Sequence, residues 1–466
     1  MIFSTAPRKN RYKKWILGLS LIVIASVSAT LFVWWRGHQE PTPTLLLNTG
    51  EETHVAIEEW TTKHGMKVLL VSTDALPILD MRLIFAAGSA RDGQLPGLAE
   101  LSSQVLLQGS QQFDAEQIAE RIDAAGSSID TSINRDMMAI SMRVLSTQEL
   151  FDQAFKTLLA ILSKPTFPPD VVIREQQRLI SNLQEQQHLP SVIASNNFYS
   201  ALYRDHPYAH PVMGTLESVS KITQQDVAAF AAQYYSAENA VLALVGDIDL
   251  ENAKALADVI EASLPAGVPA SALPTPEPLA ANAVLNIPFD STQAHVLYGT
   301  LGINRDDPDF FPLYVGNHIL GGSGLVSMLF KEVRKERGLA YNTTSQLIPL
   351  QQTGPFIINA QTRTEATEEV IAVLQHTVQD FINQGPTQEQ VQAAQSNITG
   401  NFALRLDSNA AVVDQLAMIA FYDLPPEYLA SFRAQILAVT PEQVKTAMQK
   451  HLNLNNSVLV TVGYAP

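Results

Sequence analysis

The 466-residue chain contains no cysteine, which excludes a disulfide scaffold and a cysteine-ligated zinc finger. Basic residues are scarce, because 30 Lys and Arg stand against 46 Asp and Glu, for a formal net charge of −16. A nucleic-acid-binding protein needs clustered Lys and Arg to neutralise phosphates, so the composition argues against that role. With 46% hydrophobic residues, the chain is globular and long enough for more than one domain.

Charged residues are also absent from residues 15–35, a run flanked by tryptophans and about as long as a membrane-spanning helix. Five Lys and Arg precede this run, so the positive-inside rule places residues 1–14 in the cytoplasm. We therefore expect a single-pass anchor in a bacterial inner membrane, with the bulk of the chain in the periplasm. The alternative is a cleaved signal peptide with a small-residue site at residues 27–29, although the apolar run continues beyond it.

Two segments without helical or alternating patterns divide the rest of the chain. Residues 36–50 are polar and read as a tether, and residues 264–278 are rich in proline and read as a linker. The predicted domains are therefore residues 51–263 and residues 279–466.

The two halves repeat the same landmarks at a constant offset of 217 positions. The pairs are Pro169 and Pro386, Thr223 and Thr440, Asn239 and Asn456, and Gly246 and Gly463. In each copy a threonine is placed to cap a helix that leads into an apolar strand ending at glycine. Strands and helices do not alternate strictly, which predicts an α+β fold of two tandem domains, each with one sheet and one helical layer.

Apolar periodicity predicts the main elements. The expected strands are 66–72, 79–86, 137–144, 240–245, 294–300, 355–360 and 457–462. The expected helices are 153–162, 171–186, 224–235, 366–383, 388–404 and 441–451.

Residues 97–110 begin Gly-Leu-Ala-Glu-Leu-Ser-Ser-Gln. Taken alone, this segment also fits a plain amphipathic core helix. It resembles the segment of pitrilysin/insulinase zinc peptidases that reads Gly-Leu-Ala-His-x-x-Glu-His, in which two histidines bind zinc and the glutamate activates water. Other stretches resemble the same family, which is related to mitochondrial processing peptidase. They are residues 60–71, 85–92, 206–214, 234–247 and 320–341.

The resemblance implies that every metal-site position is replaced. The two histidine positions hold Glu100 and Gln104, and the catalytic glutamate position holds Ser103. The third ligand position falls on Asn182, or on Ser181 if the alignment shifts by one residue. Serine and amide side chains are poor zinc ligands, so we expect no metal and no catalytic residue in this chain. His206 and His210 lie close together in the sequence, but no Glu-x-x-His pattern of zinc ligands stands beside them. We expect them to be structural or solvated.

The resemblance also implies that Arg334 and Tyr341 match a pair that holds the substrate backbone beside the zinc of the opposite half of the assembly. A guanidinium and a phenol can both donate hydrogen bonds to peptide carbonyls. Gly338 is placed to end the helix that carries Arg334, so that Tyr341 begins a strand and can converge with it. The alternative is a helix C-terminal cation and a half-buried strand tyrosine.

A Gly-Gly-Ser-Gly sequence lies at residues 321–324, ten residues before Arg334. It lacks the Lys-Ser/Thr of a phosphate-binding loop and follows a helical pattern instead of a strand. We expect a tight turn or a flexible edge of a substrate chamber, with Gly321, Gly322 and Gly324 as candidate substrate-binding positions.

Together these features predict a membrane-anchored, non-catalytic subunit of a two-chain zinc metallopeptidase. The partner would be a zinc-bearing member of the same family, and the ligand an unfolded peptide cut at the partner's zinc. Two alternatives remain open at this stage: a stand-alone peptide-binding or scaffold protein, and an active peptidase with an unrecognised site.

Overall fold

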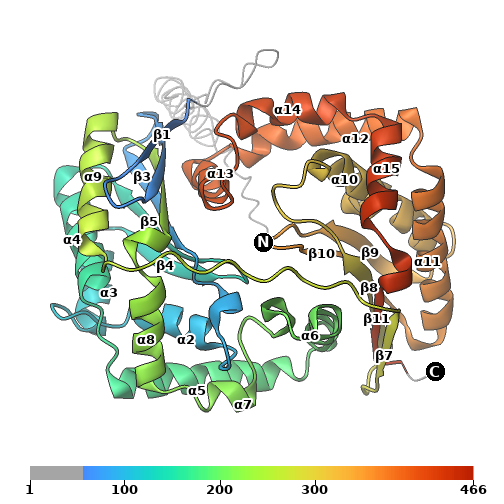
Figure 1. The fold of residues 1–466 in the computed structure, drawn as a ribbon, viewed down its shortest axis with the longest axis horizontal. Helices are drawn as coiled ribbons and strands as arrows, with labels where there is room; N and C mark the ends of the chain where they lie inside the picture. Colours follow the sequence, from blue (N-terminus) through green and yellow to red (C-terminus); the bar gives the residue numbers. More distant parts are fainter. Residues whose placement is uncertain (1–55, 465–466) are drawn as a thin grey trace, which may run out of the picture. The chain divides into compact units, whose positions relative to one another are not determined.

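The computed structural model describes residues 56–464 (Figure 1). The predicted membrane span at residues 15–35 and the predicted tether therefore lie outside the described residues. Within residues 56–464, no helix is both long enough and apolar enough to span a bilayer.

A six-stranded mixed sheet forms the first half, in the order β1-β2-β6-β3-β5-β4. Its strands are β1 (Glu58–Thr61), β2 (Lys67–Ser72), β3 (Ile78–Phe85), β4 (Ser128–Ile133), β5 (Met138–Leu145) and β6 (Ala240–Gly246). Only β2 and β6 pair in parallel, and the other neighbours are antiparallel. The central strands β3 and β6 are almost entirely buried and apolar apart from Asp80 and Arg82 of β3, as expected for strands covered on both faces.

A five-stranded mixed sheet forms the second half, in the order β7-β11-β8-β10-β9. Its strands are β7 (Ala283–Ile287), β8 (Gln293–Leu301), β9 (Ala340–Leu347), β10 (Pro355–Arg363) and β11 (Val458–Val462). Here too a single parallel pair, β7 with β11, stands beside antiparallel neighbours. The order matches β2-β6-β3-β5-β4 of the first sheet strand for strand, so the predicted duplication is confirmed, with β1 as an added edge strand.

Helices pack beside both sheets. The first half contains α2 (Leu98–Leu106), α3 (Ala115–Ala124), α4 (Gln148–Ser163), α5 (Pro169–Gln186), α6 (Pro190–Tyr203), α7 (Leu216–Val219), α8 (Gln224–Tyr234) and α9 (Leu250–Ser263). The second contains α10 (Phe310–Asn317), α11 (Thr367–Gln384), α12 (Gln388–Asn401), α13 (Asn409–Phe421), α14 (Tyr428–Ala438) and α15 (Pro441–His451). Between α9 and β7 the chain forms no helix or strand.

Local capping explains the repeated landmarks. Thr223 and Thr440 each close a capping box at the start of α8 and α15. Pro169 occupies the first position of α5, whereas Pro386 lies just before Thr387, the N-cap of α12. Helix α12 therefore begins at Gln388, as expected, and Pro386 lies two positions before it, because Thr387 supplies the capping side chain.

The two halves exchange equivalent helices. Helix α13 of the second half packs on β2, β3 and β6 of the first sheet, and α6 of the first half packs on β8 and β11 of the second (Figure 1). The two helices lie close to the 217-residue offset of the repeat. Apolar residues of the first sheet consequently join the core of the second half, including Leu69, Ile84 and Val245. This exchange joins the two halves into one compact unit.

A buried carboxylate ties the exchanged parts together. Asp136, which is 2% exposed between β4 and β5, accepts a hydrogen bond from the hydroxyl of Tyr208. Its other oxygen accepts the backbone N–H of Gln351 at 2.8 Å and the hydroxyl of Tyr422, beside α13, at 3.0 Å. Tyr203, at the end of α6, donates in the opposite direction to the carbonyl of Thr353 at 3.0 Å. The junction is therefore hydrogen-bonded from both sides.

Candidate functional site

Helix α2 carries the positions where the sequence predicts a lost metal site. It begins at Gly97, whose φ of +94° favours glycine, and the carboxylate of Asp92 caps its first turn. The two Asp92 oxygens accept the backbone N–H groups of Gly97 and Ala99, each at 2.7 Å. Burial raises the pKa of the Asp92 carboxyl to about 8, although these two backbone hydrogen bonds lower it. The helix start is thus fixed, and with it the direction of the side chains that follow.

Two hydrogen bonds join the three replaced positions on α2, while Oε1 of Gln104 is buried without a partner among the described residues. The Nε2 of Gln104 donates to Oε1 of Glu100 at 2.5 Å, and the Oγ of Ser103 donates to the Glu100 carbonyl at 2.8 Å. Burial raises the pKa of the Glu100 carboxyl, while the Gln104 hydrogen bond and the nearby Arg178 guanidinium lower it. These groups form a local polar network in which the only carboxylate already has a donor.

The third predicted position, Asn182, is exposed on α5, and Ser181 beside it bonds back to the carbonyl of Gln177 at 3.0 Å. The sequence prediction missed Glu175, a 5% exposed carboxylate on the same helix. Two guanidiniums flank it: Arg178 Nε lies 2.8 Å from one oxygen and Arg174 Nε lies 3.2 Å from the other. The sequence could have indicated Glu175. It precedes Asn182 by two helical turns, so it lies on the same side of α5.

This donor set does not fit zinc. Zinc sites in proteins use His nitrogen, Cys sulfur and carboxylate oxygen in a tetrahedral arrangement. Near α2 the chain offers an amide, a hydroxyl and two glutamates, one of which is already paired with arginine. Within residues 56–464, the metal-like group of three side chains is Asp307, Asp309 and His451 in the other half, where Asp309 is bound by Lys450 at 2.6 Å.

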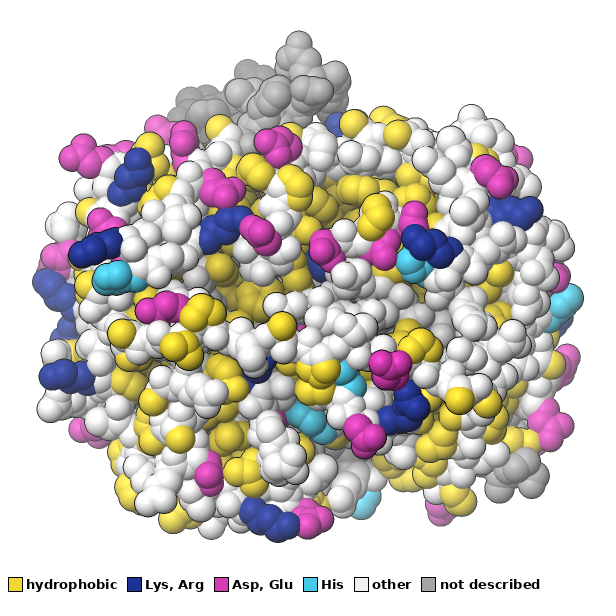
Figure 2. Space-filling model, viewed as in Figure 1, with side chains coloured by type: hydrophobic (Ala, Val, Ile, Leu, Met, Phe, Trp, Pro, Cys, Tyr) yellow, Lys and Arg dark blue, Asp and Glu magenta, His cyan; other side chains and the backbone are white. Residues whose placement is uncertain are grey.

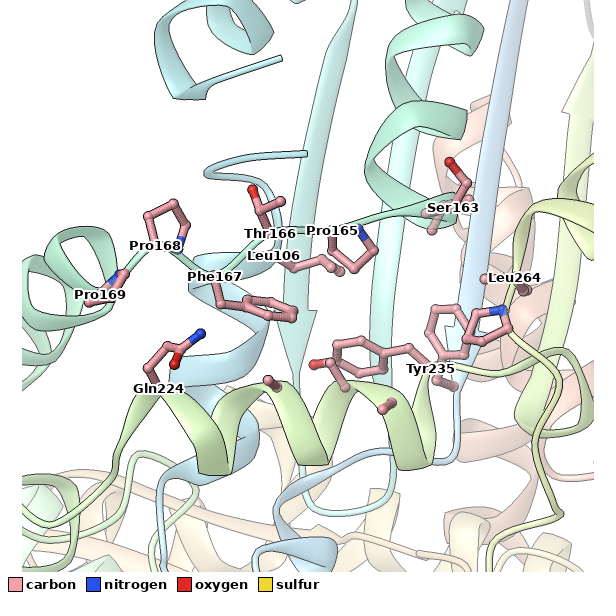
Figure 3. A pocket seen from close by; sticks show the side chains of 16 residues that line it. Leu106, Ser163, Pro165, Thr166, Phe167, Pro168, Pro169, Gln224, Tyr235 and Leu264 are labelled. Atoms are coloured by element: carbon pink, nitrogen blue, oxygen red, sulfur yellow. The ribbon is translucent and has the colours of Figure 1, made fainter. Parts of the chain in front are cut away.

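An apolar cavity of about 620 Å³ lies at the C-terminal end of α2, between α8 and the proline-rich connection from α4 to α5 (Figure 3). Phe85, Phe167 and Tyr235 contribute aromatic rings, and the other lining side chains are apolar or neutral. In Figure 3 the Tyr235 hydroxyl points toward Phe167, and this buried oxygen has no hydrogen-bond partner within the described residues. Because no acid, base or nucleophile other than hydroxyls and an amide lines this cavity, it does not replace the lost site.

In the second half, the structure brings Arg334 and Tyr341 together. Arg334 lies on a π-helical segment, η6 (Phe330–Lys335), and Gly338 ends it with a φ of +63°. The chain turns through bonds from Gly338 N to Arg334 O and from Leu339 N to Val333 O, both 2.9 Å. The Arg334 guanidinium then lies 4.6 Å from the centre of the Tyr341 ring.

Tyr341 is 78% exposed near the start of β9, the edge strand of its sheet. The alternative of a half-buried strand tyrosine is therefore wrong. Arg334 does lie in the last turn of its helical segment, so its favourable interaction with the helix dipole is compatible with contact to a ligand.

Packing accounts for two of the three predicted glycines. A Cβ at Gly321 would lie 2.4 Å from the backbone nitrogen of Ser345 on β9, and a Cβ at Gly322 would lie 2.8 Å from Nδ2 of Asn317. Gly324 has open space around it and a φ of +60°. Beyond it, Leu325 and Val326 are strongly exposed. Substrate contact by these glycines stays a prediction, and Gly324 is the position that no packing contact explains.

The two histidines have structural partners, as the sequence indicated. His206 Nδ1 accepts the N–H of Tyr208 at 3.0 Å, and its Nε2 lies 2.8 Å from the carbonyl of Pro274. His210 lies 3.8 Å from the buried carboxylate of Asp92. On the face in view in Figure 2, basic side chains are scattered among acidic and apolar ones. This distribution and the net charge of −16 both disfavour nucleic-acid binding.

Comparisons with known proteins identify the family to which this fold belongs. A family model described as the peptidase M16 inactive domain matches residues 221–398, and one described as insulinase (peptidase family M16) matches residues 67–216. The crystal structure of a peptidase M16 inactive domain from Pseudomonas fluorescens is 38% identical, with a TM-score of 0.85, and the match covers 88% of this chain and 98% of that one.

Two curated relatives carry contrasting names. An uncharacterized zinc protease of Rickettsia bellii is 24% identical over 373 residues, covering 79% of this chain and 89% of the relative. A non-peptidase homolog, YmxG, of Helicobacter pylori is 23% identical over 399 residues, covering 85% of this chain and 91% of the relative. At the positions that resemble the zinc-peptidase motif, this chain carries Glu100, Ser103 and Gln104. The chain belongs to the insulinase family of peptidases, family M16, as an inactive-type homologue.

Proposed function

We propose that the protein is the non-catalytic subunit of a two-chain zinc metallopeptidase, and that it holds an unfolded peptide for cleavage at the zinc of its partner. The observation that carries this proposal is an asymmetry between the halves. On α2, Ser103 and Gln104 both donate to Glu100, whereas Arg334 converges with the exposed Tyr341 and, within residues 56–464, has no carboxylate at ion-pair distance.

The exchanged helices support the need for a partner. Because α13 covers strands of the first sheet and α6 covers strands of the second, the sheets do not face each other across an open space within this chain. A chamber that encloses a peptide therefore needs a second chain. In this proposal Arg334 and Tyr341 donate hydrogen bonds to peptide carbonyls, a form of recognition that is independent of the peptide's side chains.

The test is peptide cleavage by the full-length chain mixed with a zinc-bearing family member from the same genome. The mixture should hydrolyse a quenched fluorescent peptide, and neither chain alone should match it. Arg334→Ala should lower kcat/KM about tenfold or more, because a hydrogen bond from a charged donor is lost, and Tyr341→Phe should lower it less. Lys335→Ala is the matched control, since it removes an exposed cation one position away.

Each other outcome has a distinct meaning. Unchanged cleavage in both variants would contradict the substrate-holding role. Peptide binding without cleavage in any mixture would favour a stand-alone binding protein. Hydrolysis by the purified chain alone would favour an active peptidase with a different site.

We also propose that residues 15–35 anchor this assembly in the inner membrane with the peptidase-like halves in the periplasm. The basis is the uncharged run behind a basic N-terminal segment. Protease added outside cells with a permeabilised outer membrane should digest the chain while sparing a cytoplasmic marker. N-terminal sequencing of the membrane fraction separates an intact anchor from a signal peptide cleaved near residues 27–29.

A further inference from the structure

The Arg334 guanidinium lies over two aromatic rings. Its guanidinium lies 4.6 Å from the ring centre of Tyr341 and 5.0 Å from that of Phe330, one helical turn earlier. Both distances lie within the range in which a cation is attracted to an aromatic face. Phe330 is half-buried, and Tyr341 is mostly exposed. The half-buried guanidinium therefore contacts two aromatic rings, one of them mostly exposed.

The neighbouring carboxylates are occupied by other cations. Arg337 lies 2.7 Å from Glu332, and Lys331 lies 3.6 Å from Glu336. Arg337 also lies 3.8 Å from Glu336. Among residues 56–464, no carboxylate lies within ion-pair distance of Arg334, although it sits in a segment dense in charge. Its five N–H donors are thus not consumed by an ion pair.

An unpaired arginine at a surface normally samples many rotamers, and it loses that freedom when it binds a ligand. A side chain that is already stacked has lost much of the freedom beforehand, so binding costs less. The π-helical form of η6 is relevant, because such segments are rare and recur at functional sites. Here that segment carries both Phe330 and Arg334.

We propose that Phe330 is a positioning residue, which together with Tyr341 fixes the plane of the Arg334 guanidinium so that its free edge meets the carbonyl groups of a bound peptide. This inference rests on the proposed function. It adds a residue that sequence comparison of the Arg334 and Tyr341 pair does not reveal.

The experiment measures kcat/KM for a quenched fluorescent peptide, with the full-length chain in complex with the zinc-bearing partner. Phe330→Leu should lower kcat/KM about two- to fivefold, the size of one exposed cation–π contact. Phe330→Tyr keeps the aromatic face and should restore the wild-type value. In an Arg334→Ala background, Phe330→Leu should have no further effect, since the two residues act through one group. Phe311→Leu is the matched control, because Phe311 is half-buried in the same half and packs on Phe432 and Tyr428 instead.

The outcomes separate the two proposals. If Arg334→Ala lowers kcat/KM and Phe330→Leu does not, the positioning role is overturned and the proposed function stands. If neither variant changes it, the proposed function fails as well. If Phe330→Leu and Phe330→Tyr cause equal losses, or if Phe330→Leu is fully additive with Arg334→Ala, Phe330 acts on folding alone and the inference is overturned.

Discussion

The α2 site and the Arg334 site lie on two copies of one fold, but their polar side chains differ in the partners that they have. Around α2, hydrogen bonds join Gln104 and Ser103 to Glu100, and Arg178 pairs with Glu175. Around η6, the carboxylates pair with other cations, and among the residues that the structure describes none forms an ion pair with Arg334, which lies beside an exposed tyrosine. Under the proposed function, the first region holds no metal and the second contacts a peptide. One half of a duplicated scaffold would then keep a binding surface after the other half had lost its metal chemistry.

The largest effect we predict is the return of a metal. The substitutions Glu100→His, Ser103→Glu, Gln104→His and Asn182→Glu restore the ligands and base of the family motif on α2 and α5. The variant should bind about one zinc ion per chain, measured by mass spectrometry of metal content after dialysis. A version that keeps Asn182 lacks one ligand and should bind more weakly. If the quadruple variant binds no zinc, α2 and α5 no longer hold these side chains in an arrangement that binds a metal.

A second prediction concerns the junction that holds the two regions in one arrangement. Asp136→Ala leaves the Tyr208 and Tyr422 hydroxyls and the Gln351 N–H without their acceptor. We expect the free energy of unfolding to fall by about 3 kcal/mol or more, measured by urea denaturation. Asp130→Ala, at an exposed position of the neighbouring strand β4, should change it by less than about 0.5 kcal/mol. Similar small effects for both variants would mean that the junction contributes little.

The smallest predicted effect concerns the charge of Glu100. Burial raises its pKa in the folded protein above the ordinary value of 4.5, so ionisation of this carboxyl disfavours folding. Glu100→Gln should therefore be more stable than the wild type at pH 7, and the difference should shrink as the pH falls toward 4.5. Glu120→Gln, exposed on α3, should show no such trend. The opposite sign at pH 7, with Glu100→Gln less stable, would indicate a bound cation at α2.

The sequence predicts the central strands and the main helices well, because their apolar runs reflect burial. Strands β3, β6 and β11 and helices α5, α11 and α15 lie within a few residues of the expected ranges. Edge strands such as β4 and β7 are not predicted, since β4 alternates polar with apolar residues and β7 is only five residues long. The helix 388–404 ends at Asn401 and continues as a short 3₁₀ turn.

Long-range features of the site could not be predicted. The exchange of α6 and α13 depends on contacts between residues far apart in the chain, and both helices have ordinary apolar patterns. The spacing of Arg334, Gly338 and Tyr341 does predict their convergence, because a glycine that ends a helix fixes the direction of the next few residues. The pairing of Glu175 with two arginines, and the position of Phe330 under Arg334, become visible only when side chains are placed.

The zinc content of the full-length wild-type chain, purified without chelators and compared with Glu100→Ala, tests the central claim most directly. The account predicts far less than one zinc ion per chain and no difference between the two proteins. About one zinc ion per chain in the wild type, lost in Glu100→Ala, would contradict it.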